Sequence, residues 1–135
     1  MKYPVVSIVE DDVSVREAMA LLLQSAGMDS QSFGSAEQFL SEFIACQDDI
    51  MVLDLNLPGM SGLDLLKKIR LDGMNIQVIV TTAFDDPLSR ELCKSYGVLV
   101  YLRKPVDGAA LIDLIRYNLP MAILDKNQTH KIKIS

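Results

Sequence analysis

Short apolar runs and helical stretches alternate five times along this chain of 135 residues, and that alternation restricts its fold more than any other feature. Apolar runs rich in β-branched residues predict strands, and apolar residues spaced three and four positions apart predict amphipathic helices. Repeated strand–helix units are typical of an α/β domain with a parallel sheet. We expect strands at 5–9, 29–33, 50–54, 77–81 and 98–102, and helices at 13–26, 35–44, 62–71, 86–96 and 107–119.

Polar residues before several of the helical stretches support these boundaries. Ser35, Asp86 and Asp107 each precede a helical pattern, and Asp11 or Asp12 precedes the first, so that their side chains can accept hydrogen bonds from unpaired amides of the first turn. The apolar stripe of the first helix predicts its buried face, made of Val15, Ala18, Met19, Leu22, Leu23 and Ala26.

Composition and charge narrow the class of protein. At 135 residues and 50% hydrophobic content, the chain is long enough for one buried core. We expect one domain at 1–121, with 122–135 as a polar tail or the beginning of a linker. The net charge of −5 argues against binding of nucleic acid or an anionic membrane. The two cysteines have no metal-site spacing, and the first run is too short for a signal peptide or membrane span, which predicts a soluble, cytoplasmic protein with free thiols.

Polar side chains fall at the carboxyl ends of four of the predicted strands. Glu10 and Asp11 follow the first strand, and Asp54, Thr82 and Lys104 follow or end the third, fourth and fifth. In a parallel sheet these ends share one edge, where ligands of open α/β sheets bind. Clustered carboxylates are hard oxygen ligands of the kind that Mg²⁺ prefers, and a lysine and a hydroxyl can contact a phosphoryl group. The pattern predicts phosphoryl transfer onto Asp54. Helix capping by each acid separately is the alternative reading.

Four segments together resemble the receiver domain of two-component response regulators, over residues 3–120. They are IVEDD at 8–12, LDLNLPGMSG at 53–62, VTTA at 80–83 and YLRKP at 101–105. The resemblance is greatest to the subfamily of the nitrogen-fixation regulator, which is linked to a C-terminal helix-turn-helix. It implies a flavodoxin-like (βα)5 sandwich with a five-stranded parallel sheet in the order 2-1-3-4-5.

The resemblance also implies a role for each residue at the sheet edge. Asp54 would take a phosphoryl group from a sensor histidine kinase. Mg²⁺ would be bound by Asp11, Asp54 and the backbone carbonyl of Asn56, with Glu10 acting through a water. Lys104 would pair with a phosphoryl oxygen, and the bond between it and the following proline would be cis. Such a domain catalyses only its own phosphorylation and dephosphorylation.

A switch pair is implied as well. The Thr82 hydroxyl would move toward the phosphoryl group, and Tyr101 would rotate from exposed to buried. The surface formed by the fourth helix, fifth strand and fifth helix would then form a homodimer. Two positions depart from the commonest family pattern. Glu10 stands where an aspartate is usual, and Phe84 places a large apolar side chain where smaller or polar residues are common; we expect Phe84 to affect water access.

Other functions fit the sequence less well. An aspartyl phosphatase would carry an aspartate where this chain has Asn56, and a flavin or nucleotide module would have a glycine-rich turn after the first strand. We expect transcription regulation through a DNA-binding domain absent from this chain. A single-domain response regulator, or a receiver-like module that acts without phosphorylation, is the alternative.

Overall fold

The computed structural model describes residues 5–43 and 50–118 and contains the parallel sheet that the alternation predicts. All neighbouring strands pair in parallel, in the order β2-β1-β3-β4-β5. This order confirms the flavodoxin-like topology. The strands are β1 (Val6–Val9), β2 (Ser30–Phe33), β3 (Ile50–Asp54), β4 (Gln77–Thr82) and β5 (Val100–Arg103).

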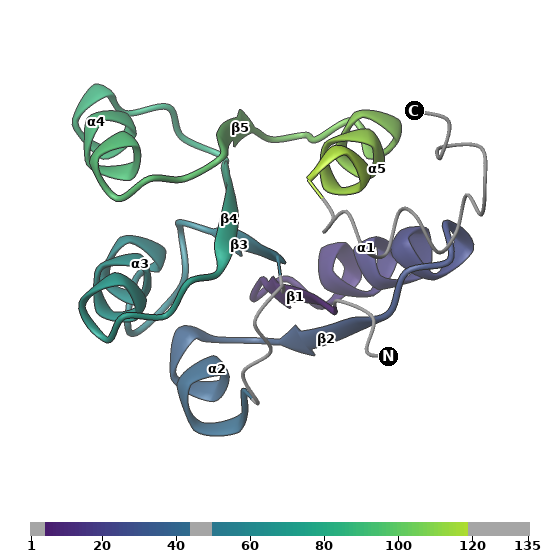
Figure 1. Ribbon diagram of the computed structural model, residues 1–135, viewed down its shortest axis with the longest axis horizontal. Coiled ribbons are helices and arrows are strands. Elements are labelled where there is room, and N and C mark those ends of the chain that lie inside the picture. Colours follow the sequence, from purple (N-terminus) through teal and green to yellow (C-terminus); the bar gives the residue numbers. More distant parts are fainter. Residues whose placement is uncertain (1–4, 44–49, 119–135) are drawn as a thin grey trace, which may run out of the picture.

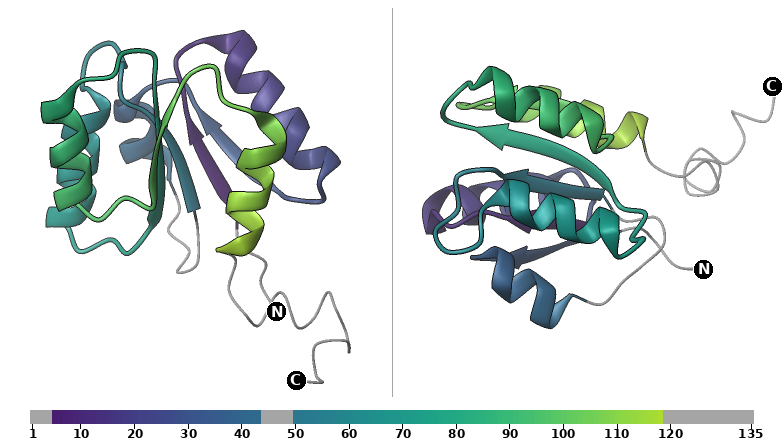
Figure 2. Two further views of the ribbon diagram at one scale, coloured as in Figure 1. Left: turned by 90° about the horizontal axis from the view of Figure 1, so that it is seen from above. Right: turned by 90° about the vertical axis from the view of Figure 1, so that its left-hand side faces the viewer.

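The described part of the chain contains five helices, which cover the two faces of the sheet. Helices α1 and α5 lie on one face, and α2, α3 and α4 lie on the other (Figure 1), so that the sheet forms the middle of three layers when seen from above (Figure 2). Helices on both faces bury a parallel sheet from either side. The helices are α1 (Val13–Ser25), α2 (Ala36–Glu42), α3 (Gly62–Leu71), α4 (Pro87–Ser95) and α5 (Gly108–Tyr117).

The predicted capping residues begin these helices. The side chains of Asp12, Ser35, Asp86 and Asp107 accept hydrogen bonds from backbone amides of the first turn of α1, α2, α4 and α5. Ser61 does the same for α3. Each cap satisfies an amide that has no partner inside the helix, which is why the predicted helix starts are accurate.

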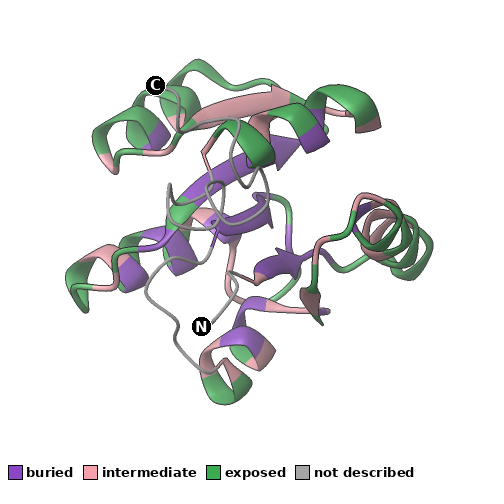
Figure 3. Ribbon diagram, turned by 45° about the vertical axis from the view of Figure 1, so that its right-hand side comes forward, coloured by how far each residue is buried: buried purple, intermediate pink, exposed green. Residues whose placement is uncertain are grey.

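Two hydrophobic clusters lie on opposite faces of the sheet. Side chains alternate along each strand, so that Val78 and Val80 of β4 pack with α2, α3 and α4, while Ile79 packs with α1 and α5. Every residue of β3 is buried, as its continuous apolar run predicts. Burial is concentrated in the strands and exposure in the outer helical surfaces (Figure 3).

Some predicted details are wrong. Strand β5 begins at Val100 and not at Val98, because the amide of Val98 donates to the Cys93 carbonyl and completes the end of α4. The sequence predicts Ala18 in the buried stripe of α1, but Ala18 is exposed, and Leu23 is the one fully buried residue of that helix. The expected helix ends at 44 and 119 and the tail at 122–135 lie outside the described residues.

Candidate functional site

Four strand ends bring the predicted site residues to one edge of the sheet. Glu10 directly follows β1, Asp54 and Thr82 end β3 and β4, and Lys104 directly follows β5. The sheet register fixes them relative to one another: the Lys104 amide donates to the Thr82 carbonyl at 2.8 Å, and Asp54 pairs with Thr81. The sheet thus gathers residues that lie up to 94 positions apart in the sequence.

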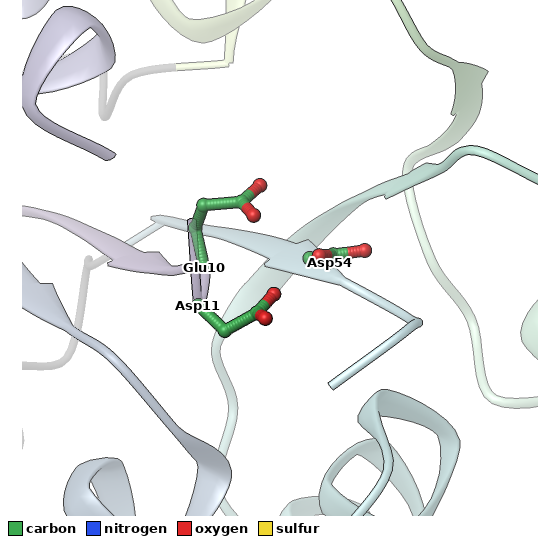
Figure 4. A group of neighbouring side chains, drawn as sticks. All are labelled: Glu10, Asp11 and Asp54. Carbon is green, nitrogen blue, oxygen red and sulfur yellow. The ribbon is translucent and has the colours of Figure 1, made fainter. Parts of the chain in front are cut away.

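Three carboxylates form the centre of the site (Figure 4). Glu10, Asp11 and Asp54 each offer one oxygen, and these oxygens all lie within 4.8 Å of one another. Glu10 and Asp54 are 2% and 3% exposed, whereas Asp11 is open to solvent. Three hard oxygen donors at this separation, one of them accessible to water, suit Mg²⁺, which binds few protein carboxylates and keeps several waters. These residues therefore fit the predicted metal.

Lys104 balances part of this negative charge. Its Nζ lies 2.8 Å from Glu10 Oε1 and 3.3 Å from Asp54 Oδ2. Burial lowers the pKa of Lys104, but the hydrogen bond to Glu10 and the charge of Asp54 outweigh it, so that the net shift is upward. Burial raises the pKa of Glu10 despite its hydrogen bond to Lys104. Lys104 is therefore held as a cation between two carboxylates.

The loop after β3 fixes the carboxylate of Asp54. The Asn56 amide donates to Asp54 Oδ1 at 3.0 Å, and the Gly62 amide donates to the Leu55 carbonyl at 3.1 Å. Gly62 approaches so closely that a Cβ there would lie 2.4 Å from the Asp54 carbonyl oxygen. The start of α3 is thus packed directly on the backbone of Asp54.

The side chain of Asn56 joins this loop to the end of β4. Its Oδ1 lies 2.9 Å from Thr82 Oγ1 and accepts from the Ala83 amide at 3.3 Å. Thr82 Oγ1 also lies 2.9 Å from the Phe84 carbonyl oxygen and has one hydrogen to donate. The sequence assigned Asn56 only a backbone role, so this side-chain link to Thr82 is an addition to the predicted site. The Phe84 side chain is 71% exposed.

Tyr101 of β5 lies on the face of the sheet covered by α2, α3 and α4. Its ring packs against the hydrophobic cluster of that face, and the Arg90 guanidinium carbon lies 5.4 Å from the ring centroid. Arg90 also forms an ion pair with Asp85. The Tyr101 hydroxyl is buried without a hydrogen-bond partner in the described part of the chain. Tyr101 is therefore half-buried and held between the core and α4.

Two further residues support the site and were missed in the sequence. Arg16 of α1 donates from Nη1 to the Glu10 carbonyl at 2.8 Å, and Glu37 of α2 accepts from the Met60 amide at 2.8 Å. The Met60 hydrogen bond holds the pKa of Glu37 below its usual range. In both contacts a helix side chain binds the backbone of a loop. The sequence offers a signal only for Arg16, which lies shortly after the acidic segment.

The remaining predictions about the site concern single features. The bond between Lys104 and Pro105 is cis, as expected. Cys93 is a free, buried cysteine, whereas Cys46 lies outside the described residues. Within 5–43 and 50–118, no helix is long and apolar enough to cross a membrane.

Comparison with known proteins gives consistent matches to one family. The family model "Response regulator receiver domain" matches residues 6–116. Over 115 residues, the chain is 39% identical to the transcriptional regulatory protein FixJ of Azorhizobium caulinodans, a match that covers 84% of this chain and 54% of FixJ. The chain spans about half the length of the curated relatives it matches.

Solved structures agree with this match. A response regulator receiver protein from Pseudomonas putida is 30% identical, with a TM-score of 0.77, and the match covers 87% of this chain and 98% of that one. The structure titled FixJ-N is also 30% identical, with a TM-score of 0.76 and coverage of 86% and 93%.

Proposed function

The chain belongs to the family of response regulator receiver domains, and we propose from this premise that Asp54 accepts a phosphoryl group from a sensor histidine kinase. The observation that carries the proposal is the grouping of three carboxylates within 4.8 Å of one another, with Lys104 Nζ 3.3 Å from Asp54. A bond would form between an Asp54 carboxylate oxygen and phosphorus as the bond from phosphorus to the kinase histidine breaks. The domain would catalyse its own phosphorylation and dephosphorylation and no other reaction.

The acidic residues are placed to hold Mg²⁺. Asp11 and Asp54 would bind it directly, Glu10 would act through a water, and the backbone carbonyl of Asn56 would complete the protein ligands. When bound, the cation would offset the negative charge that the phosphoryl group adds beside three carboxylates. Lys104 would exchange a carboxylate partner for a phosphoryl oxygen, which its position beside Asp54 supports.

Thr82, Asn56 and Tyr101 would transmit the change. A phosphoryl group on Asp54 adds strong acceptor oxygens, and the Thr82 hydroxyl, now near Asn56 and the Phe84 carbonyl, could donate to one of them. The inward position of Tyr101 would be favoured as Thr82 moves. The surface of α4, β5 and α5 would then form a homodimer, a proposal supported by the exposure of Phe84, Leu88 and Leu92 near or on α4.

The output would be regulation of transcription by a DNA-binding domain that follows the receiver in a longer protein. Support comes from the relative FixJ, whose name describes a transcriptional regulatory protein and of which the matched region is about half. The net charge of −5 supports a domain that binds no nucleic acid or membrane itself, and we propose a cytoplasmic location. A single-domain regulator, or an interaction module that works without phosphorylation, is the alternative.

Intact-mass measurement after incubation with acetyl phosphate and Mg²⁺ tests the acceptor. The wild type should gain one phosphoryl group, Asp54→Asn should gain none, and Asp29→Asn, a control at an exposed aspartate just before β2, should behave as the wild type does. Size exclusion of the same samples reports dimerisation. An unmodified wild type that folds normally and binds Mg²⁺ would favour the module that works without phosphorylation.

Thr82→Ala tests the switch separately. The variant should be phosphorylated on Asp54 but should dimerise less than the wild type, because the hydroxyl that responds to the phosphoryl group is gone. Dimerisation equal to that of the phosphorylated wild type would refute the role of Thr82.

A further inference from the structure

A pocket with a volume of about 500 Å³ lies between α1 and α5, on the opposite face of the sheet from α3 and α4. Apolar side chains of both helices line it, among them Met19 and Leu22 of α1 and Leu111 of α5. Pockets of roughly 300–1,000 Å³ with apolar walls and few polar groups are typical of small-molecule sites. The dimensions and the lining are therefore those of a ligand pocket.

The pocket explains why the buried stripe predicted for α1 is incompletely buried. Ala18 is exposed, and Val15, Met19 and Leu22 are only partly buried, although all four belong to the apolar stripe that faces α5. These side chains keep apolar surface in contact with solvent. A bound apolar molecule would remove that surface from water, which is a favourable change.

Thr81 provides a polar group at the base of the pocket. It lies two residues after Ile79 in β4, so its side chain points to the face covered by α1 and α5. Thr81 is 1% exposed, and its hydroxyl has no hydrogen-bond partner in the described part of the chain. Buried hydroxyl groups are normally paired, so a ligand group here would supply a missing partner. Met19, an unbranched side chain in the wall, can change rotamer to admit it.

The ammonium group of Lys104 is not available to bind a charged ligand in the pocket. Its Nζ is already paired with Glu10 and Asp54, at 2.8 and 3.3 Å, so the methylene groups are the part that can line the pocket. Among residues 5–43 and 50–118, no other charged side chain lines it. We propose that this pocket binds an uncharged small molecule with a mostly apolar body and one group that hydrogen-bonds to Thr81. The proposal does not depend on phosphorylation of Asp54.

Titration with N-phenyl-1-naphthylamine, an uncharged apolar dye with one N–H group, tests the site in the whole chain. Dye fluorescence should rise saturably with one dye per chain. Ala18→Trp, which fills the pocket, should weaken binding at least about tenfold through loss of the apolar contacts. Leu21→Trp, at a 65% exposed position of the same helix outside the pocket, should leave binding unchanged. Thr81→Val should weaken it about fivefold, as expected for loss of a hydrogen bond between neutral groups.

Backbone amide chemical shifts of the wild type provide a test that needs no variant to fold. The dye should shift the amides of Met19, of Leu111 and of Val106, which lines the pocket from the loop between β5 and α5, and leave those of α4 unchanged. No saturable binding, binding that survives a folded Ala18→Trp, or loss of binding in Leu88→Gln on α4 would overturn the proposal. One further outcome would overturn it: a wild type that is a dimer and excludes the dye, together with an Ala18→Trp variant that is a monomer. In that case a second copy of the chain would cover the pocket.

Discussion

Replacement of Gly62 by alanine should destabilise the protein, although alanine is the better helix former. Gly62 is the buried first residue of α3. An added Cβ would lie 2.4 Å from the Asp54 carbonyl oxygen and 2.6 Å from Leu55 Cα. Ordinary contacts begin near 3.4 Å, so one of the two backbones must retreat by about 1 Å. Neither contact is to a flexible side chain, so the strain cannot be relieved by a rotamer change.

The expected cost follows from two opposing contributions. Overpacking of a close-packed site costs about 3 kcal/mol at the upper end of the usual range. Alanine lowers the conformational entropy of the unfolded chain and so contributes about 1 kcal/mol in the other direction. The free energy of unfolding should therefore fall by about 2 kcal/mol. With a urea dependence of about 2 kcal/mol per molar, the midpoint should fall by about 1 M.

Two other glycines provide matched controls in the same urea experiment, monitored by far-ultraviolet circular dichroism. Gly108 also begins a helix, but its added Cβ would meet the end of the Leu22 side chain at 2.9 Å, which can rotate away. Gly108→Ala should therefore change the free energy of unfolding by less than about 1 kcal/mol. Gly73 has φ +76° and open space around it, so Gly73→Ala should show the cost of the left-handed conformation alone, about 1 kcal/mol.

Gly62→Ala should also slow phosphorylation if Asp54 is the acceptor as proposed, because the displaced backbone belongs to that residue. Gly108→Ala and Gly73→Ala should be phosphorylated at the wild-type rate. A Gly62→Ala protein with a midpoint equal to or above that of the wild type would refute the steric reasoning, because only the favourable contribution of alanine would then remain.

Three further predictions concern side chains outside the cluster of Glu10, Asp11 and Asp54. Cys93 is fully buried, and burial raises the pKa of its thiol above the ordinary value of 9.0. Above pH 9.0 the thiol ionises in the unfolded chain but not in the folded protein, so the free energy of unfolding should fall as the pH rises. Cys93→Ala should lack this fall when urea unfolding is measured between pH 8 and 10. Arg70 donates to three backbone carbonyls, so Arg70→Ala should lower the free energy of unfolding by about 2–3 kcal/mol. Arg70→Lys lacks the planar guanidinium and should recover less than half of the lost stability. A urea midpoint of Arg70→Ala equal to that of the wild type would contradict this. The hydrogen bond from Met60 lowers the pKa of Glu37, so the wild type should lose stability relative to Glu37→Gln as pH falls below 4.5, and parallel pH profiles would count against that role.

The order of elements and most of their boundaries can be predicted from local patterns in the sequence. Apolar runs define the strands, and Ser35, Asp86 and Asp107 define the starts of three helices, because capping depends on residues within one turn. Local signals fail where a residue serves two elements. Val98 fits a strand by composition, but its amide completes the end of α4.

The principal residues of the site are also predictable, because each lies at the end of a strand. Parallel pairing sends Glu10, Asp54 and Lys104 to the same edge whatever the helices do. The supporting residues are different. Arg16, Glu37 and the Asn56 side chain contact the site through bonds that depend on how helices and loops are placed around the sheet.

The sequence by itself determined which chemical groups stand at the strand ends, since strand and helix periods and helix caps are local properties. Only the tertiary structure decided how those groups pair and which space between the helices remains unfilled. That Lys104 contacts both Glu10 and Asp54, that Gly62 has no room for a Cβ, and that α1 and α5 leave a pocket over Thr81 all depend on distances between elements. Such distances are set by the packing of many side chains at once, and no single stretch of the sequence records them.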